Sequence, residues 1–128
     1  MSASVYEQSV TFSFEAAHEL GSNVAGRDGH PYARVHGHSF VATLTLRGPS
    51  VGDEGWIMDY AALKALCAEI QGRLDHQFLN AIPGLERPTL ETIAAWIFRA
   101  AAEKTDLVWR VEIARPTLGE RAAYTAQS

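Results

Sequence analysis

The chain has 128 residues, of which 47% are hydrophobic and 20% are charged, and its formal net charge at pH 7 is −4. These values are typical of one globular domain, which we expect to span residues 1–128. They exclude a basic surface for a nucleic-acid backbone and the long apolar run of a membrane-spanning helix. Since the first residues lack a secretory signal and the chain has one cysteine, we expect a cytoplasmic protein. The negative net charge favours a small-molecule ligand.

Two stretches in the first third of the chain alternate apolar and polar residues, as half-buried strands do. The first covers residues 9–18 and ends on His18. A loop rich in Gly, Asn, Asp and Pro follows over residues 21–34. The alternation returns from His36, which shares a face of the second strand with His38. We therefore expect two strands joined by a long loop, with histidines at the loop ends of both.

The middle of the chain predicts two amphipathic helices. Asp59 is in position to cap a helix over residues 60–74, whose apolar stripe includes Cys67. Thr89 is in position to cap a second helix over residues 90–104.

Two further strands are predicted near the C-terminus, over residues 107–115 and 121–126. The resulting order is β-β-α-α-β-β. Strands placed on either side of two consecutive helices indicate an α+β domain, in which both helices lie on one face of an antiparallel sheet.

The histidines at the strand ends are candidate metal ligands. Neutral imidazole is a common zinc ligand, and His36 and His38 project from the same side of one strand. His18 could supply a third ligand if the two strands are antiparallel neighbours. A short H-x-H pattern is weak on its own, however, because a strand histidine is more often packed or hydrogen-bonded. The residues alone leave both interpretations open.

Several motifs occur together and in a characteristic order. They are "FSFEAAH", "VHGHSF", "GWIMDYAALK", "LDHQFLN" and "IPGLERPTLETIAAWI", followed by a tyrosine-bearing last strand. In this order and spacing the chain resembles the 6-pyruvoyl-tetrahydropterin synthase family, most of all its bacterial 6-carboxytetrahydropterin synthase branch. The resemblance implies a tunnelling fold, with a four-stranded antiparallel sheet and two helices on one face. It also implies a homohexamer, a dimer of trimers with active sites between subunits.

The same resemblance implies a cofactor and a chemistry. His18, His36 and His38 match the family's ligands for Zn²⁺. Family members act as lyases on dihydroneopterin triphosphate, whose side chain loses triphosphate and is rearranged or cleaved. Asp75 and His76 match an Asp-His pair that assists proton transfer, although the same two residues could simply end the first helix.

One departure from the family concerns the base. The cysteine that resemblance places four residues before the H-G-H motif is replaced by Tyr32. Cys67 lies on a helix stripe, where a free cysteine behaves as a small hydrophobe. His30 or Asp28 could serve instead if the loop folds over the zinc, and a merely structural loop is the alternative.

A second departure concerns the pterin ring, which the family binds through a glutamate on the third strand. Arg115 matches that position and has donors only. Glu112 has the wrong strand parity, whereas Glu120, beyond the turn, could replace the glutamate. Arg115 could instead meet an anionic ligand group, or be a solvated charge at the strand end. Thr89 and Glu91 match residues of the pterin pocket and also suit a helix start.

The sequence thus predicts a zinc-binding homologue of the pterin synthases that acts on a pterin-type small molecule. Conversion of dihydroneopterin triphosphate should be slow, because the thiolate and the ring-binding glutamate are both absent. A non-catalytic pterin-binding or regulatory homologue is the main alternative. A hexameric structural homologue with vestigial histidines is a third. The pathway stays open among queuosine-type deazapurine, tetrahydrobiopterin and folate synthesis.

Overall fold

A computed structural model of the protein describes residues 5–21 and 33–126. The two predicted helices and four predicted strands follow in the expected order: β1 (Tyr6–His18), β2 (His36–Gly48), α1 (Tyr60–Leu74), α2 (Leu90–Ala102), β3 (Val108–Arg115) and β4 (Glu120–Tyr124). Two short 3-10 helices are added, η2 (Leu79–Ala81) after α1 and η3 (Pro116–Leu118) between β3 and β4. The expected α+β class and β-β-α-α-β-β order are therefore confirmed.

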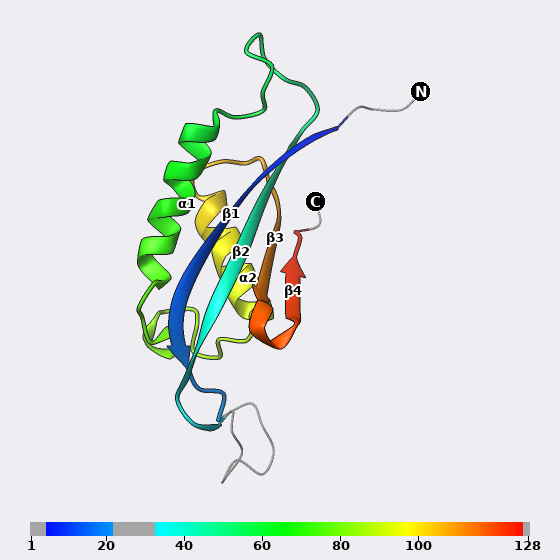
Figure 1. The fold of residues 1–128 in the computed structure, drawn as a ribbon. Coiled ribbons are helices and arrows are strands. Elements are labelled where there is room, and N and C mark those ends of the chain that lie inside the picture. The colour runs from blue at the N-terminus through cyan, green and yellow to red at the C-terminus, as the bar shows by residue number, and fades with distance from the viewer. Residues whose placement is uncertain (1–4, 22–32, 127–128) are drawn as a thin grey trace.

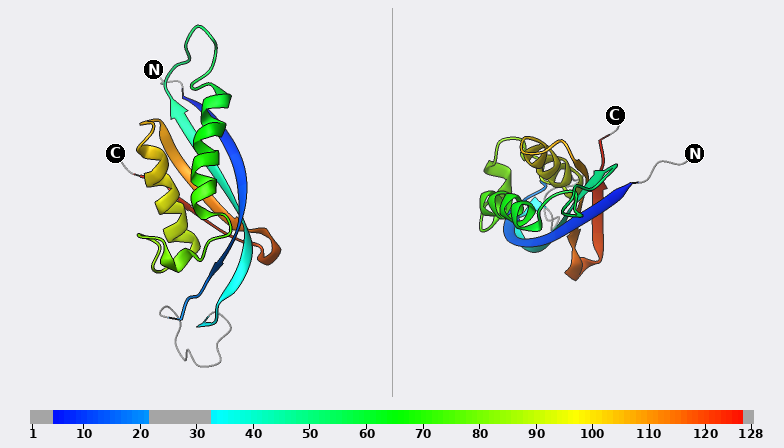
Figure 2. Two further views of the ribbon diagram at one scale, coloured as in Figure 1. Left: turned by 90° about the vertical axis from the view of Figure 1, so that its left-hand side faces the viewer. Right: turned by 90° about the horizontal axis from the view of Figure 1, so that it is seen from above.

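The strands form one antiparallel sheet in the order β1-β2-β3-β4. Both helices cover the same face of this sheet, and its other face carries no helix (Figures 1 and 2). α1 packs chiefly on β1, whereas α2 packs on β3 and β4. We call the helix-covered side the inner face and the opposite side the outer face.

The core lies between the inner face and the two helices. Inner positions of neighbouring strands meet there, as the stacked rings of Phe14 and Phe40 show with centroids 5.0 Å apart. The apolar side chains of the two helices complete the core on the side facing the sheet, where Leu63, Cys67 and Ile70 of α1 are all buried. Burial of such side chains is the main favourable contribution to folding.

Both helices begin where the sequence predicts. The Asp59 carboxylate accepts a 2.9 Å hydrogen bond from the backbone N–H of Ala61, and the Thr89 hydroxyl accepts one of 3.2 Å from Thr92. These caps satisfy backbone donors that have no partner inside the first helical turn. Neither helix in the described ranges is long and apolar enough to cross a membrane.

Some element ends differ from the prediction. β1 begins at Tyr6 rather than at residue 9, and polar Gln8 occupies a buried inner position. Its amide exchanges hydrogen bonds of 3.0 and 2.8 Å with the backbone of Met58, a contact that local alternation cannot reveal. β4 covers Glu120–Tyr124 rather than residues 121–126, because it pairs with the last five residues of β3.

Candidate metal centre

The register of β1 and β2 brings three histidines together. His18 lies directly opposite His36, and His38 follows two residues later on the same face of β2. One nitrogen from each ring lies within 4.8 Å of the other two, so the three residues could hold a metal ion. We refer to His18, His36 and His38 as the histidine cluster. Antiparallel pairing, the condition set by the sequence for a third ligand, is met.

Backbone carbonyl groups orient two of these rings. Nδ1 of His18 lies 2.8 Å from the carbonyl oxygen of Pro88, and Nδ1 of His36 lies 2.7 Å from that of Arg34. Because a carbonyl oxygen only accepts, each Nδ1 carries a hydrogen, and Nε2 is the nitrogen that the neutral ring offers to a metal. This pattern of a backbone acceptor behind the ring is typical of metal-ligating histidines.

The ligand nitrogens are buried and suit a cation. Nε2 of His18 and Nε2 of His38 have no hydrogen-bond partner among residues 5–21 and 33–126, although both atoms are buried. A buried polar atom without a partner is costly, and a metal ion would satisfy both. Tetrahedral zinc places its ligand atoms roughly 3.4 Å apart, so small ring movements would close the cluster around an ion.

Burial keeps His18 and His38 uncharged at neutral pH. It lowers the pKa of His18 to about 4, against the Pro88 carbonyl, which favours the protonated ring. Burial also lowers the pKa of His38 to about 4, and the positive charge of Arg115 is the next cause. Protons therefore do not compete for these two rings near pH 7, and neutral imidazole is the form that binds metal.

A carboxylate and an imidazole meet where α1 ends. Oδ2 of Asp75 lies 3.0 Å from Nδ1 of His76, whose side chain is 80% exposed. Oδ1 of Asp75 accepts a 2.8 Å hydrogen bond from the backbone N–H of Glu15. That backbone donor, followed by the hydrogen bond to His76, keeps the pKa of Asp75 below its usual value. An ionised Asp75 thus orients an accessible imidazole.

The segment that carries this pair is fixed to β1. The backbone N–H of His76 donates to the Glu15 carbonyl at 2.6 Å, and that of Ala17 donates to the Gln77 carbonyl at 3.0 Å. His76 has a φ of 59°, in the left-handed region that favours glycine. A residue needed only to end α1 would be easier to accommodate as glycine, which favours a functional role for this side chain.

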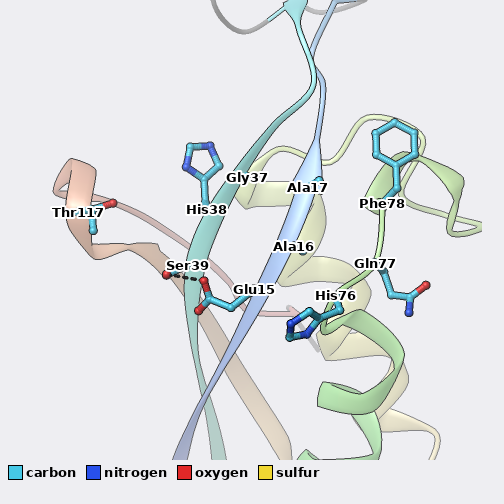
Figure 3. A pocket seen from close by; sticks show the side chains of 10 residues that line it. All are labelled: Glu15, Ala16, Ala17, Gly37, His38, Ser39, His76, Gln77, Phe78 and Thr117. Carbon is cyan, nitrogen blue, oxygen red and sulfur yellow. Dashed lines mark hydrogen bonds between the residues drawn. The ribbon is translucent and has the colours of Figure 1, made fainter.

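An open hollow of about 610 Å³ lies beside the Asp-His pair. Figure 3 shows His76 on one flank of the hollow and Thr117 on the other, with Glu15 and Ser39 between them. The Ser39 hydroxyl donates a 2.7 Å hydrogen bond to the Glu15 carboxylate. Within the histidine cluster, His38 alone borders this hollow among the described residues. The hollow can therefore accept a small molecule next to both groups.

The predicted ligand-binding residues divide into two groups. Arg115 is buried on the inner face and forms a 2.8 Å ion pair with Glu120, directly opposite on β4. Its positive charge lowers the pKa of both His38 and His18, so it lies near the cluster. Thr89 caps α2 directly after Pro88, while Glu91 is exposed in the first turn of that helix.

The sequence also raised candidates for the catalytic base and for binding the pterin ring. His30, Tyr32 and Asp28 lie outside the described residues. Cys67 is buried, and burial raises the pKa of its thiol to about 11, in agreement with a core role. Glu112 lies on the opposite face of β3 from Arg115, as its strand parity predicts, and it pairs with Arg110 at 3.5 Å.

Sequence reasoning missed two contributors to the site. Pro88 orients His18 through its carbonyl, and Glu15 connects Asp75, His76 and Ser39 through its backbone and carboxylate. Backbone contributions carry no residue-type signal. Glu15 did offer one, since a carboxylate stands among the small polar residues of the outer face of β1.

The family model described as 6-pyruvoyl tetrahydropterin synthase matches residues 7–127. The chain belongs to this family. A Synechocystis protein named 6-carboxy-5,6,7,8-tetrahydropterin synthase is 44% identical over 97 residues, which cover 72% of this chain and 71% of the relative. A Pyrococcus furiosus protein named dihydroneopterin monophosphate aldolase is 33% identical over 85 residues, or 66% of this chain and 65% of the relative.

Solved structures of the 6-pyruvoyl tetrahydropterin synthase family share the fold. The Caenorhabditis elegans enzyme superposes with a TM-score of 0.83 at 22% identity, covering 97% of both chains. A Plasmodium vivax synthase has a TM-score of 0.70 at 19% identity, with 98% of this chain and 99% of that chain covered. That structure is of a catalytic-residue variant in which glutamate is replaced by cysteine. At these identities the likeness concerns the fold.

Proposed function

We propose that this member of the 6-pyruvoyl tetrahydropterin synthase family binds Zn²⁺ through His18, His36 and His38 and acts as a lyase on a pterin-type substrate such as dihydroneopterin triphosphate. The observation that carries the proposal is the convergence of three imidazole nitrogens within 4.8 Å, two of them buried without a partner in the described ranges. Three protein ligands leave the fourth zinc position for a substrate, as in catalytic zinc sites. The names of the relatives support the pterin assignment.

Different residues of the chain would carry out metal binding and proton transfer. Zinc held by the cluster would polarise the hydroxyl groups of a dihydropterin side chain and acidify the neighbouring protons. His76 is the group that moves such protons, and Asp75 fixes its tautomer because the carboxylate accepts from Nδ1–H. Nε2 of His76 then faces the ligand as the base. The Ser39–Glu15 pair supplies polar contacts in the wall of the hollow.

We propose that the working form is a homohexamer, a dimer of trimers. On the sheet, the hollow is bordered by outer-face residues such as Glu15 and Ser39 and also by inner-face His38, so it reaches the histidine cluster at the end of β2. Joining sheets edge to edge would complete the wall of this hollow and cover the open edges of β1 and β4. Size-exclusion chromatography with light scattering tests this state directly.

We expect slow turnover of dihydroneopterin triphosphate. Tyr32 stands where the resemblance places a thiolate, and a phenol with an unperturbed pKa near ~10 is a weak base at neutral pH. General base catalysis is worth roughly 10²- to 10⁴-fold, so this loss alone lowers the rate substantially. Tyr32→Cys should therefore raise the rate of triphosphate release, whereas Tyr32→Phe, which keeps the ring and supplies no base, should not. Rapid turnover by the wild type would contradict this part of the proposal.

The central experiment compares metal content with turnover. Wild-type protein should hold about one zinc per subunit, and His36→Ala should lose stoichiometric metal by elemental analysis. His76→Ala is the matched control, because it removes an imidazole outside the cluster and should keep zinc while losing turnover. Full zinc in His36→Ala would refute the metal assignment. Zinc and pterin binding without turnover of any dihydroneopterin phosphate would instead support the non-catalytic alternative.

A further inference from the structure

Arg115 presents a buried cation at a position where the rest of the inner face is apolar. It follows Val111 and Ile113 on the same face of β3, and both of these are fully buried. The Arg115 side chain is only 9% exposed. Burying a guanidinium is costly unless its donors are paired, so a specific role is expected for it.

The guanidinium is only partly paired. Its Nη2 meets Oε1 of Glu120 at 2.8 Å, but Nε and Nη1 are buried without a hydrogen-bond partner in residues 5–21 and 33–126. Glu120 is on the edge strand β4, its side chain is 39% exposed, and its ion pair with Arg115 is made at Nη2. Nε–H points away from Nη1, so the two nitrogens donate in different directions, and each can give a charge-assisted hydrogen bond to a negative group.

Arg115 lies near the histidine cluster in the register of the sheet. Ala114 pairs with Val41, so Arg115 stands one residue further along, beside Phe40. His38 is two residues before Phe40 on the same face of β2, which makes Arg115 and His38 diagonal neighbours across the two strands. Glu120 already supplies one negative charge to this guanidinium, and a ligand oxyanion would supply another between Arg115 and a zinc-loaded cluster, where two cations repel each other.

We propose that Arg115 is an anion-binding residue of this site, which donates from Nε or Nη1 to an oxyanion of the ligand, a phosphate or a carboxylate, beside the histidine cluster. Glu120 is its positioning residue, because it holds Nη2 and so aims the other two nitrogens. The ligand group that binds here is therefore negative. In the resembled family the matching residue is a glutamate, which would instead accept hydrogen bonds from donors on the pterin ring. The inference rests on the proposed function only for the pterin part of the ligand.

The first test uses an anion without a pterin. Metal-free wild type, Arg115→Met and Arg121→Met are titrated with inorganic pyrophosphate at constant ionic strength, and thermal unfolding is followed. Arg121 is the matched control, because it lies on β4 opposite Ala114 and is 70% exposed. We expect pyrophosphate to raise the Tm of wild type and Arg121→Met and to leave Arg115→Met unchanged. Since Arg115→Met also leaves Glu120 without its ion-pair partner, the shift of each variant is measured from its own Tm without ligand.

The second test separates the two sources of the anion. Zinc-loaded wild type and Arg115→Met are titrated calorimetrically with 6-carboxypterin and with unsubstituted pterin. At least a tenfold loss for 6-carboxypterin, with less than a twofold change for pterin, assigns the site to a carboxylate. A pyrophosphate response alone assigns it to a phosphate, and Arg115→Lys, which keeps the charge without the fork, should recover only part of either effect.

The outcomes also separate this inference from the proposed function. If Arg115→Met matches wild type in the pyrophosphate and 6-carboxypterin titrations, the anion site is refuted, even where pterin binding stands. If wild type binds neither pterin yet shows the Arg115-dependent pyrophosphate response, the anion site stands and the pterin proposal fails.

Discussion

Replacing Cys67 by serine should lower stability and leave the active site unchanged. Cys67 is 2% exposed on the inward stripe of α1, between Leu63 and Ile70, which are also buried. Burial raises the pKa of its thiol to about 11, so the group is a neutral thiol at pH 7. A nucleophile or base is thus not available there, and the substitution tests packing alone.

The expected cost of this substitution follows from its surroundings. A hydroxyl placed in an apolar site costs about 1–3 kcal/mol, and a helical serine can donate to the carbonyl four residues earlier, here that of Leu63. We therefore expect the low end, about 1 kcal/mol, which corresponds to a fall in Tm of roughly 3–5 °C for a chain of this size. Cys67→Ala, which adds no polar group, is the control that separates lost packing from desolvation of the hydroxyl.

Urea unfolding followed by circular dichroism measures the change in the free energy of unfolding. Zinc content and turnover of dihydroneopterin phosphates are measured on the same preparations. The thiol of native wild type should react slowly with a disulfide reagent and become fully reactive in urea. Fast labelling of the native protein, or a hundredfold loss of turnover in Cys67→Ser with unchanged unfolding, would refute this reasoning.

Four other substitutions test the remaining architecture. Thr89→Ala should cost about 1 kcal/mol in urea unfolding through loss of the α2 cap. Ile93→Ala, at a fully buried position, should cost about 2–5 kcal/mol in the same assay, and a smaller loss would mean that the core is looser than described. His76→Gly should relieve left-handed backbone strain and raise stability by up to about 1 kcal/mol while abolishing turnover; unchanged turnover would exclude His76 as the base. Because the pKa of Asp75 is lowered by folding, its ionised form stabilises the protein above the unfolded pKa, near 4, and this contribution disappears as the pH falls through the folded pKa. Asp75→Asn should thus be less stable than wild type at neutral pH and indistinguishable from it in strong acid, and a gap that persists in acid would contradict the linkage.

The local sequence pattern was sufficient to predict features that depend on residues close together in the chain. The caps at Asp59 and Thr89 and the shared face of His36 and His38 depend on spacing of a few residues, which the sequence displays directly. The third ligand, His18, required the pairing of two strands, and the predicted order of elements was enough to indicate it.

Long-range partners were not predictable in the same way. From the sequence, Arg115 matched the position of the family's ring-binding glutamate, and Glu120 was a separate candidate to replace that glutamate. The register of β3 and β4 places the two residues directly opposite each other, where they form an ion pair. The Pro88 carbonyl behind His18 lies 70 residues away in the chain and carries no side-chain signal. Such contacts depend on the tertiary fold, so alternation and motif spacing contain little information about them.

β1 carries both halves of the proposed machinery within four consecutive residues. Glu15 and Ala17 anchor the Asp-His segment through their backbone, while His18 supplies a cluster nitrogen. The position of β1 therefore determines the positions of both His18 and the Asp-His segment. A shift of its register against β2 by two residues would displace each of them by about 6.6 Å. Metal affinity and proton transfer should consequently fail together in variants that loosen β1, even when every named side chain is retained.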